Sequence, residues 1–265
     1  MKQHIVIIGI GEIGAVFARG FLRLGHPVYP ATRSTDLNNL ANTIEPALVI
    51  VAVGEGDLQS TLSNLPDSWR DRIVLLQNEL LPSSWQQHTL TDPTVISIWF
   101  EKKKGQDSKV LIPSPAFGPH AKLLYDTLAA VDIPVKQLNN ADELLFELVV
   151  KNLYIITTNV AGLKVGGNVG ELQSKHEALM RAIANEVLAI QASLTQRSFD
   201  NEALIVAMRK AMDADPEHKC MGRSAPARLQ RALTQAADAG LDVPYLKKNR
   251  RFRSFFRGSL DIHPS

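Results

Sequence analysis

The sequence predicts an α/β protein with two domains: a doubly wound, mostly parallel sheet over residues 1–140, followed by an all-helical domain over residues 141–265. In the first half, short β-branched runs alternate with helical patterns, which is typical of a parallel sheet covered by helices on both faces. After Leu138 the strand patterns stop, and no convincing strand follows as far as Gly240.

Seven apolar, β-branched runs are candidate strands of the first domain: His4–Ile8, Pro27–Pro30, Leu48–Val53, Ile73–Leu76, Val95–Trp99, Val110–Ile112 and Val135–Gln137. The helical patterns between them are Ala15–Leu24, Leu58–Asn64 and His120–Val131. The helical patterns of the second domain are Asp142–Leu163, Lys175–Leu194, Asn201–Asp213 and Pro226–Ala239. The polar stretch Asn139–Asp142 is typical of a helix cap and could begin the helix that connects the two domains. We expect the basic tail Lys247–Arg253 to be frayed.

Composition places the chain among ordinary globular proteins. Of its 265 residues, 45% are hydrophobic and 21% are charged, which supports a buried core and argues against disorder. The formal net charge is only +2, so no general preference for polyanions follows. The single cysteine, Cys220, excludes an intramolecular disulfide, and we find neither a signal peptide nor the run of roughly 20 apolar residues that spans a bilayer. We expect a cytoplasmic protein that binds neither nucleic acid nor membrane.

A glycine-rich turn follows the first strand directly. The segment Gly9-Ile10-Gly11-Glu12-Ile13-Gly14 matches G-x-G-x-x-G and opens an amphipathic helix, which is the context that a dinucleotide-binding Rossmann unit requires. Gly9 permits the tight turn, Gly11 lets the backbone approach a pyrophosphate, and Gly14 lets the helix pack close to the strand. The helix N-terminus offers N–H groups and a positive dipole end to the phosphates. We therefore assign Gly9, Gly11, Glu12, Ile13 and Gly14 to cofactor binding; a chance glycine-rich turn is the alternative.

The tip of the second strand carries basic and hydroxyl residues, where an NAD site usually has an acid about 20 residues after the loop. Thr32, Arg33 and Ser34 stand at this tip, and Asp36 comes shortly after them. A guanidinium can bind a 2′-phosphate with two parallel hydrogen bonds, and the two hydroxyls are further donors. The pattern favours NADP(H) over NAD(H); a solvated Arg33 that pairs with Asp36 is the alternative.

The ends of the third and fourth strands are expected to add contacts, because ligands of open α/β sheets lie beyond the carboxyl ends of the strands. Val53 and Gly54 come at the end of the third strand, and Gln77 and Asn78 come after the fourth. We assign Val53, Gly54 and Asn78 to the cofactor, with Asn78 placed to orient the nicotinamide ribose or the substrate. A turn or cap role for Asn78 is nearly as well supported.

Together with a lysine-bearing helix that opens the helical half, these features resemble ketopantoate reductase (2-dehydropantoate 2-reductase). The segment Glu147–Leu163 is the more specific part of the resemblance, since the family has a lysine on this helix with asparagines four and eight residues later. Lys151 matches the lysine, and Asn159 matches the second asparagine. The resemblance spans about residues 4–245.

The resemblance implies an NADPH-dependent reductase of a small 2-oxo acid or related carbonyl, as in the conversion of ketopantoate to pantoate for pantothenate biosynthesis. It implies that Lys151 donates the proton and that Asn159 positions the substrate, and it allows a homodimer through the helical domain. The chemistry is reasonable, because a ketone that accepts hydride develops negative charge on its oxygen, which a nearby ammonium stabilises and protonates.

Two positions depart from the family pattern. Ile155 stands where the family has its first asparagine. Asn152 faces about 100° away from Lys151 on the helix, whereas Thr158 lies nearly in line with Lys151 and could replace the missing amide. Ser224 stands near the place of a family glutamate, and with its basic neighbour it could hold an anionic substrate. Ketopantoate itself is therefore one option among several.

Other interpretations stay open. Lys151 could pair with Glu147 on a helix surface, although a helix that is apolar nearly all round is typical of burial. A non-catalytic NADP(H)-binding sensor on the same fold, or an imine or opine-type reductase, would also fit the missing residues. The spacing of the histidines does not match that of metal ligands, which argues against a metal site. The motif G-x-S-x-G is absent, which argues against a Ser–His–Asp hydrolase. We expect Glu101–Lys104 to be a solvated hairpin end, and Arg250–Arg257 to be a solvated or partly packed tail rather than a contact for nucleic acid or lipid.

Overall fold

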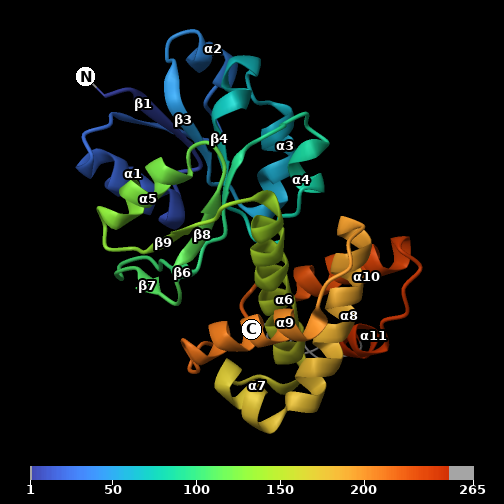
Figure 1. The fold of residues 1–265 in the computed structure, drawn as a ribbon. Helices are drawn as coiled ribbons and strands as arrows, with labels where there is room; N and C mark the ends of the chain where they lie inside the picture. The colour runs from blue at the N-terminus through green and yellow to red at the C-terminus, as the bar shows by residue number, and fades with distance from the viewer. Residues whose placement is uncertain (1, 251–265) are drawn as a thin grey trace, which may run out of the picture. The chain divides into compact units, whose positions relative to one another are not determined.

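The computed structural model describes residues 2–250, with only the backbone of Arg250 (Figure 1). The contacts within it divide the chain into two compact units, Met1–Leu148 and Val149–Ser265. The division falls inside helix α6 (Ala141–Val165), which begins in the polar stretch expected to cap a helix. The two units are therefore described one at a time.

The first unit is built on a seven-stranded sheet with the order β2-β1-β3-β4-β5-β8-β9 (Figure 1). The first five strands are parallel to their neighbours, β8 is antiparallel to β5, and β9 is parallel to β8. The mostly parallel sheet expected from the sequence is confirmed. Its strands are β1 (His4–Ile8), β2 (Val28–Ala31), β3 (Pro46–Val51), β4 (Ile73–Leu75), β5 (Thr94–Ile96), β8 (Ser114–Phe117) and β9 (Val135–Gln137).

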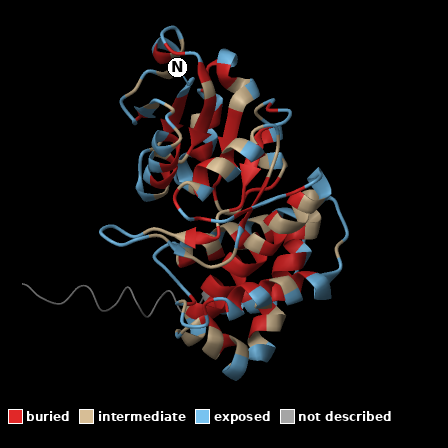
Figure 2. Cartoon of the chain, turned by 60° about the vertical axis from the view of Figure 1, so that its left-hand side comes forward, coloured by how far each residue is buried: buried red, intermediate tan, exposed pale blue. Residues whose placement is uncertain are grey.

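Each face of the sheet has its own apolar core. Neighbouring residues of a strand point to opposite faces, so Ile5 and Ile7 of β1 lie in one core, and Val6 and Ile8 lie in the other. Figure 2 shows the sheet strands largely buried and the outer sides of the helices exposed. The first core includes residues of α1 (Glu12–Arg23) and α5 (Ala121–Ala129). The second includes residues of α2 (Leu37–Ala41), α3 (Leu58–Ser63), the 3-10 helix η2 (Asp67–Arg72) and α4 (Ser83–Gln86).

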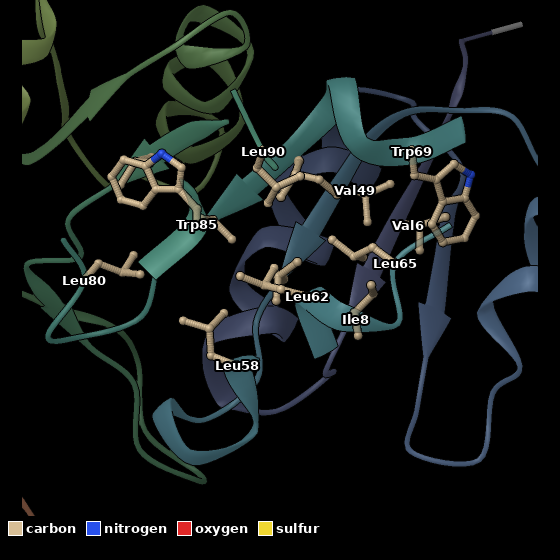
Figure 3. Packing of buried hydrophobic residues seen from close by; sticks show 14 of the residues in the cluster. Val6, Ile8, Val49, Leu58, Leu62, Leu65, Trp69, Leu80, Trp85 and Leu90 are labelled. Carbon is tan, nitrogen blue, oxygen red and sulfur yellow. The ribbon is translucent and has the colours of Figure 1, made fainter. Parts of the chain in front are cut away.

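The second core contains two tryptophans that the short helices bring onto the sheet. Trp69 of η2 and Trp85 of α4 belong to one buried cluster with Val6 and Val49 of the central strands (Figure 3). Trp69 is 1% exposed, so the indole is almost fully removed from water. Burial of such large apolar side chains dominates core energetics. The packing holds the strands whose ends carry the loops of the site.

Two strand predictions differ from the structure. The strand predicted at Val110–Ile112 lies outside the main sheet, where β7 (Lys109–Val110) pairs with β6 (Phe100–Glu101) in an antiparallel hairpin. Strand β8 is missing from the prediction, because Pro115 lacks a backbone donor and argues against a central strand. The Pro115 carbonyl nevertheless accepts a hydrogen bond of 2.9 Å from the amide of Ser97, and tertiary pairing on both sides overrides the local signal.

The second unit is helical, which confirms the helical half predicted from the sequence. Its helices after α6 are α7 (Val169–Lys175), α8 (Glu177–Thr195), α9 (Asn201–Asp213), α10 (Ala225–Asp238) and α11 (Pro244–Arg250). Helix α7 is absent from the prediction. It begins with a capping box in which the side chain of Asn168 accepts from the amide of Glu171 at 2.8 Å. This pairing of an Asn with a Glu three residues later is a signal that could have found the helix.

Helix α6, in which the division between the two units falls, is long and apolar. By length and composition alone it is apolar enough to cross a membrane. However, 78% of its most apolar window is buried inside the protein. A core helix passes the same test, because a helix that is hydrophobic all round is one that other elements cover.

Residues 244–250 form a helix rather than the frayed tail that we expected. The buried carboxylate of Glu186 accepts hydrogen bonds from the amides of Tyr245 and Leu246, at 2.7 and 2.8 Å, and so caps the first turn of α11. Leu246 and Asn249 are buried. A cap from a distant helix leaves no local signal, which explains the wrong prediction. The rest of the predicted tail, residues 251–257, lies outside the described residues.

Gly20 of α1 offers a test of how closely this helix packs on α5. A β-carbon at Gly20 would stand 2.3 Å from the carbonyl oxygen of Thr127. Alanine normally stabilises a helix interior over glycine by about 1 kcal/mol, but a clash with backbone should reverse the sign. We expect Gly20→Ala to lower the free energy of unfolding by about 1–3 kcal/mol in urea denaturation. Leu22→Ala, at an exposed position of α1, is the control; unchanged or higher stability of Gly20→Ala would contradict this packing.

Candidate functional site

A pocket of about 640 Å³ opens at the carboxyl ends of β1, β2 and β3. The chain passes from β1 to β2 on one side and places β3 on the other side, so the connections diverge at this point. Open α/β sheets bind ligands at such a switch point. The pocket is lined by Gly9 after β1, by Thr32 and Arg33 after β2, and by Val53 and Gly54 after β3.

Close backbone contacts explain the glycines of the first loop. Gly9 has a φ of +92°, and a β-carbon there would lie 2.8 Å from the carbonyl oxygen of Ala52. A β-carbon at Gly14 would lie 2.3 Å from the carbonyl oxygen of Gly9, so a side chain would push α1 off the strand ends. A β-carbon at Gly11 would meet nothing within 4 Å. The backbone at Gly11 is therefore accessible, while Gly9 and Gly14 are required by the fold.

Helix α1 starts at the end of this loop, with Gly11 as its N-cap residue and no side-chain cap among the described residues. The first bond of the helix runs from the amide of Ala15 to the carbonyl of Gly11, at 2.8 Å. Glu12 and Ile13 lie in the first turn, whose amides precede any partner within the helix. Such an end favours an anion. The Glu12 carboxylate is paired with Lys102, with 3.3 Å between Oε2 and Nζ.

The residues after β2 place hydroxyl groups and a guanidinium beside the pocket. The hydroxyl oxygens of Thr32 and Ser34 lie 3.1 Å apart, and Thr35 Oγ1 accepts from the amide of Thr32 at 2.9 Å. The side chain of Arg33 is 95% exposed, and its Nη2 donates to Asp57 Oδ2 at 3.2 Å. The structure therefore brings the three predicted residues together and adds Thr35 and Asp57, which our reading of the sequence missed.

Two carboxylates lie in the wall of the same pocket, which bears on the choice of cofactor. Asp36 is not the partner of Arg33, because its Oδ1 accepts from the amides of Asn38 and Asn39 and so caps α2. Asp57, which follows β3, is the partner. A phosphate bound here would meet one guanidinium and two acids.

The side chains after β4 hold the strand ends in place. Gln77 is 7% exposed, and its Nε2 donates to the carbonyls of Val51 and Val53, at 2.6 and 3.2 Å. Asn78 Nδ2 donates to Glu55 Oε1 at 3.0 Å. Gln77 is thus a structural link between β3 and β4, and Asn78 is directed at the loop that follows β3.

In the second unit, Lys151 lies on α6 and is partly buried. Its Nζ stands 6.0 Å from the centre of the Tyr154 ring, and that ring is 6.4 Å from the ring of His218. Glu147, one turn before Lys151, bonds to Lys136 at 2.9 Å. An aromatic face attracts an ammonium. Lys151 therefore stands beside the ring of Tyr154, within a largely buried stretch of α6.

Asn159 lies two turns further along α6 and is 7% exposed. Its Oδ1 accepts from Nη1 of Arg228 on α10, at 3.1 Å. Sequence reasoning missed Arg228, because an arginine on an amphipathic helix is usually solvated and no local pattern reveals a partner 69 positions away. The pair places a cation beside the amide that matches the family's second asparagine.

Other polar groups of α6 serve the structure of the second unit. The hydroxyl of Thr158 donates to the carbonyl of Tyr154 at 2.8 Å, and Thr158 is 2% exposed. Asn152 donates to Gln191 of α8 at 2.9 Å in a buried contact. Ile155 is 6% exposed and adds apolar surface. These contacts give Thr158 and Asn152 packing roles, and the position of the missing amide is occupied by a buried aliphatic side chain.

Ser224 lies at the N-terminus of α10 and is exposed. Its carbonyl accepts from the amide of Arg228 at 3.0 Å, so the two residues share the first turn of α10. Through the side chain of Arg228, this turn contacts Asn159. The structure thus links Asn159 to the Arg228 side chain, and it places Ser224 one helical turn before Arg228 in the backbone of α10. Within residues 2–250, no three His, Cys, Asp or Glu side chains are arranged to hold a metal ion.

A search of protein-family models and a search of curated proteins find no match to the chain. Solved structures do match its fold. A 2-dehydropantoate 2-reductase from Methylococcus capsulatus has a TM-score of 0.70 at 14% identity, over 98% of this chain and 99% of that chain. A dimeric ketopantoate reductase from Staphylococcus aureus has a TM-score of 0.62 at 16% identity, over 97% and 99%. A D-mandelate dehydrogenase solved with NADH has a TM-score of 0.66 at 15% identity, over 98% and 100%.

These similarities confirm at the level of the fold the resemblance to ketopantoate reductase that the sequence predicts. They extend over nearly the whole chain, so they include both the glycine-loop unit and the helical unit. The departures at Ile155 and Ser224 therefore occur within a shared fold.

The thiol of Cys220 is buried in the loop between α9 and α10. A β-carbon added at Gly162 of α6 would lie 2.9 Å from the β-carbon of Cys220. Burial, with a smaller effect of the Glu171 carboxylate, raises the pKa of this thiol to about 11. The thiolate is the reactive form. We expect a disulfide reagent at neutral pH to label Cys220 only after the protein unfolds.

The same shift makes stability depend on pH. The pKa of this thiol in the folded protein lies above its ordinary value of 9.0, so the folded state binds the proton more tightly, and stability should fall as the pH rises from about 9 to about 11. Cys220→Ser should remove this part of the fall in urea denaturation. Rapid labelling of the native protein, or the same fall in Cys220→Ser, would contradict the burial.

Proposed function

We propose that the chain is a divergent relative of the ketopantoate reductases that reduces a small 2-oxo acid, or a related carbonyl compound, with NADPH. The observation that carries the proposal is the glycine loop: its backbone is accessible at Gly11, and no side chain within residues 2–250 caps the N-terminus of α1. A dinucleotide pyrophosphate binds to accessible backbone N–H groups of this kind, at a helix N-terminus beside the switch point of the sheet. The similarity of fold to several oxidoreductases supports the class of reaction.

The cofactor would be held by the four loops that follow β1, β2, β3 and β4 in the first unit. Gly9, Gly11, Glu12, Ile13 and Gly14 would hold the pyrophosphate by backbone groups, and Val53, Gly54 and Asn78 would flank the rest of the dinucleotide. Bound NADPH would supply the hydride. These contacts would hold NADPH and NADH equally well, because backbone donors bind the pyrophosphate that both cofactors share.

The preference for NADPH rests on Arg33, with the hydroxyls of Thr32 and Ser34 as further donors. The ion pair between Arg33 and Asp57 is exposed, and such pairs contribute about 0–1 kcal/mol. Arg33 can therefore turn from Asp57 to a 2′-phosphate at small cost. Its bond to Asp57 runs through Nη2, whereas a phosphate carries more negative charge than a carboxylate and can accept two parallel hydrogen bonds from the guanidinium. Asp57 competes with the phosphate and sets how strong the preference is.

Lys151 would donate the proton to the carbonyl oxygen of the substrate. An ammonium near this oxygen stabilises the negative charge that develops as hydride arrives. The position of Lys151 on a long, buried helix, beside the Tyr154 ring, restricts its motion. A catalytic group on a rigid element is placed more accurately than one on a loop.

Arg228, Asn159 and Ser224 would bind the carboxylate of a 2-oxo acid. The guanidinium of Arg228 already bonds to the Asn159 amide, and a guanidinium is well suited to a planar carboxylate. Ser224, in the same turn of α10, can add a hydroxyl donor. This cluster would take over the anchoring of the substrate that the family assigns to its first asparagine and its glutamate.

A second candidate function is a non-catalytic NADP(H)-binding sensor. Two observations favour it: Ile155 is buried where the resemblance expects an amide, and the oxygen of Asn159 is engaged by Arg228. A protein that keeps its cofactor loop while it loses polar catalytic groups would have these features. The two candidates differ in turnover and not in dinucleotide binding.

We further propose a homodimer through the helical unit, since one structural relative is described as dimeric; light scattering of the purified protein tests it. We propose a cytoplasmic location, with a small molecule as the ligand rather than nucleic acid or membrane, to be checked by imaging of the tagged chain in cells.

The choice of cofactor can be tested at the pair of Arg33 and Asp57. We expect Arg33→Ala to weaken NADPH binding by about tenfold or more, because a charged hydrogen bond to the 2′-phosphate is lost, and to change NADH binding little. Asp57→Asn removes the competing carboxylate and should tighten NADPH binding. Fluorescence titration measures both affinities. Equal losses for NADPH and NADH in Arg33→Ala would count against the phosphate role.

The proton donor can be tested by turnover with a panel of 2-oxo acids that includes ketopantoate. We expect Lys151→Gln to lower the rate of NADPH oxidation by about a hundredfold or more, since general acid catalysis contributes that much, and to leave NADPH affinity unchanged. Lys164→Gln, at an exposed position of α6, is the matched control. Tight NADPH binding without turnover of any substrate would favour the sensor.

A further inference from the structure

Lys102, in the turn of the β6–β7 hairpin, contacts Glu12, which follows the glycine loop at the start of α1. Its Nζ lies 3.3 Å from Glu12 Oε2 and donates to the carbonyl of Lys103 at 2.9 Å. The side chain of Lys102 is 18% exposed, whereas the side chain of Lys103 is 67% exposed. The hairpin predicted at Glu101–Lys104 is present, but the prediction that its charges are all solvated is wrong for Lys102.

The base of the hairpin that carries Lys102 is packed into the core of the first unit. Phe100 of β6 is 5% exposed and belongs to the core that α1 covers, and Val110 of β7 packs against the same core. The amide of Leu111 donates to the carbonyl of Trp99 at 2.9 Å and continues the ladder at the base of the hairpin. A lysine held in this way loses little conformational entropy when it binds a ligand.

Glu12 creates an electrostatic problem for the proposed pyrophosphate. It is the first residue of α1 and places a carboxylate at the helix end where the phosphates would sit. A carboxylate within a few ångströms of a phosphate repels it. Lys102 offsets that charge here, and its ammonium, which has three donors, can turn from the carboxylate to a phosphate oxygen.

We propose that Lys102 is a pyrophosphate-binding residue of the dinucleotide site, held near the loop by Glu12 until the cofactor binds. The inference rests on the proposed dinucleotide site and adds to it a cation that the glycine motif does not contain. The motif meets phosphate charge with backbone N–H groups and the helix dipole. Lys102 adds a full positive charge from a different part of the chain.

The test titrates the full-length protein with NADPH and with adenosine 2′-monophosphate, which lacks the pyrophosphate. We expect Lys102→Gln to weaken NADPH binding by about tenfold and to leave binding of the monophosphate unchanged. Lys102→Arg keeps the charge and should bind NADPH almost as the unmodified protein does. Lys104→Gln makes the same change in charge at an exposed position of the same turn, and it is the matched control.

Glu12→Gln separates a ligand contact from a structural tether. If Lys102 binds the pyrophosphate, removing the competing carboxylate should leave NADPH affinity unchanged or higher. A loss as large as that of Lys102→Gln would overturn the proposal, because the pair would then act by holding the hairpin. Equal effects of Lys102→Gln and Lys104→Gln, or equal losses for both ligands in Lys102→Gln, would also overturn it. Failure of the unmodified protein to bind either NADPH or NADH would instead refute the proposed function.

Discussion

The close approach of α1 to the ends of β1 and β3 is the constraint on which the site depends. The carbonyl of Gly9 occupies the space of a side chain at Gly14, and the carbonyl of Ala52 occupies the space of a side chain at Gly9. Gly9 and Ala52 directly follow β1 and β3, and their amides donate to the carbonyls of Ala31 and Ile8 at 2.9 and 2.7 Å, so these backbone atoms cannot move aside without breaking those hydrogen bonds. The contact sets the end of α1 beside the strand ends, where the loops after β2 and β3 surround one pocket.

The cations beside the first loop are held by carboxylates of the same unit. Arg33 pairs with Asp57, and Lys102 pairs with Glu12. Pairs of this kind keep a basic group near the loop, and where they are exposed they can be exchanged at little cost. On the proposed function, an anionic ligand would compete with these acids for cations that are already in place. The acids would then influence both affinity and the choice between cofactors.

Three buried polar side chains of α6 bond either to the helix backbone or to a neighbouring helix. Asn152 and Thr158 are buried with hydrogen bonds to Gln191 and to the helix backbone, as buried polar groups must be. Asn159 bonds to Arg228 of α10. Where the resemblance expects one amide, α6 carries the buried aliphatic side chain of Ile155. The fold is thus shared while the polar groups differ.

The sequence by itself determined the sheet, the helical half and the glycine loop with its helix, because hydrophobic periodicity and the position of glycines are local properties. It also indicated Arg33 at a strand tip. Only the tertiary structure decided that Pro115 lies within a sheet strand, that Asp57 is the partner of Arg33, and that Lys102 lies against Glu12. Each of these depends on a partner far away in the chain, and a local pattern carries no information about which distant atoms packing will bring within a few ångströms.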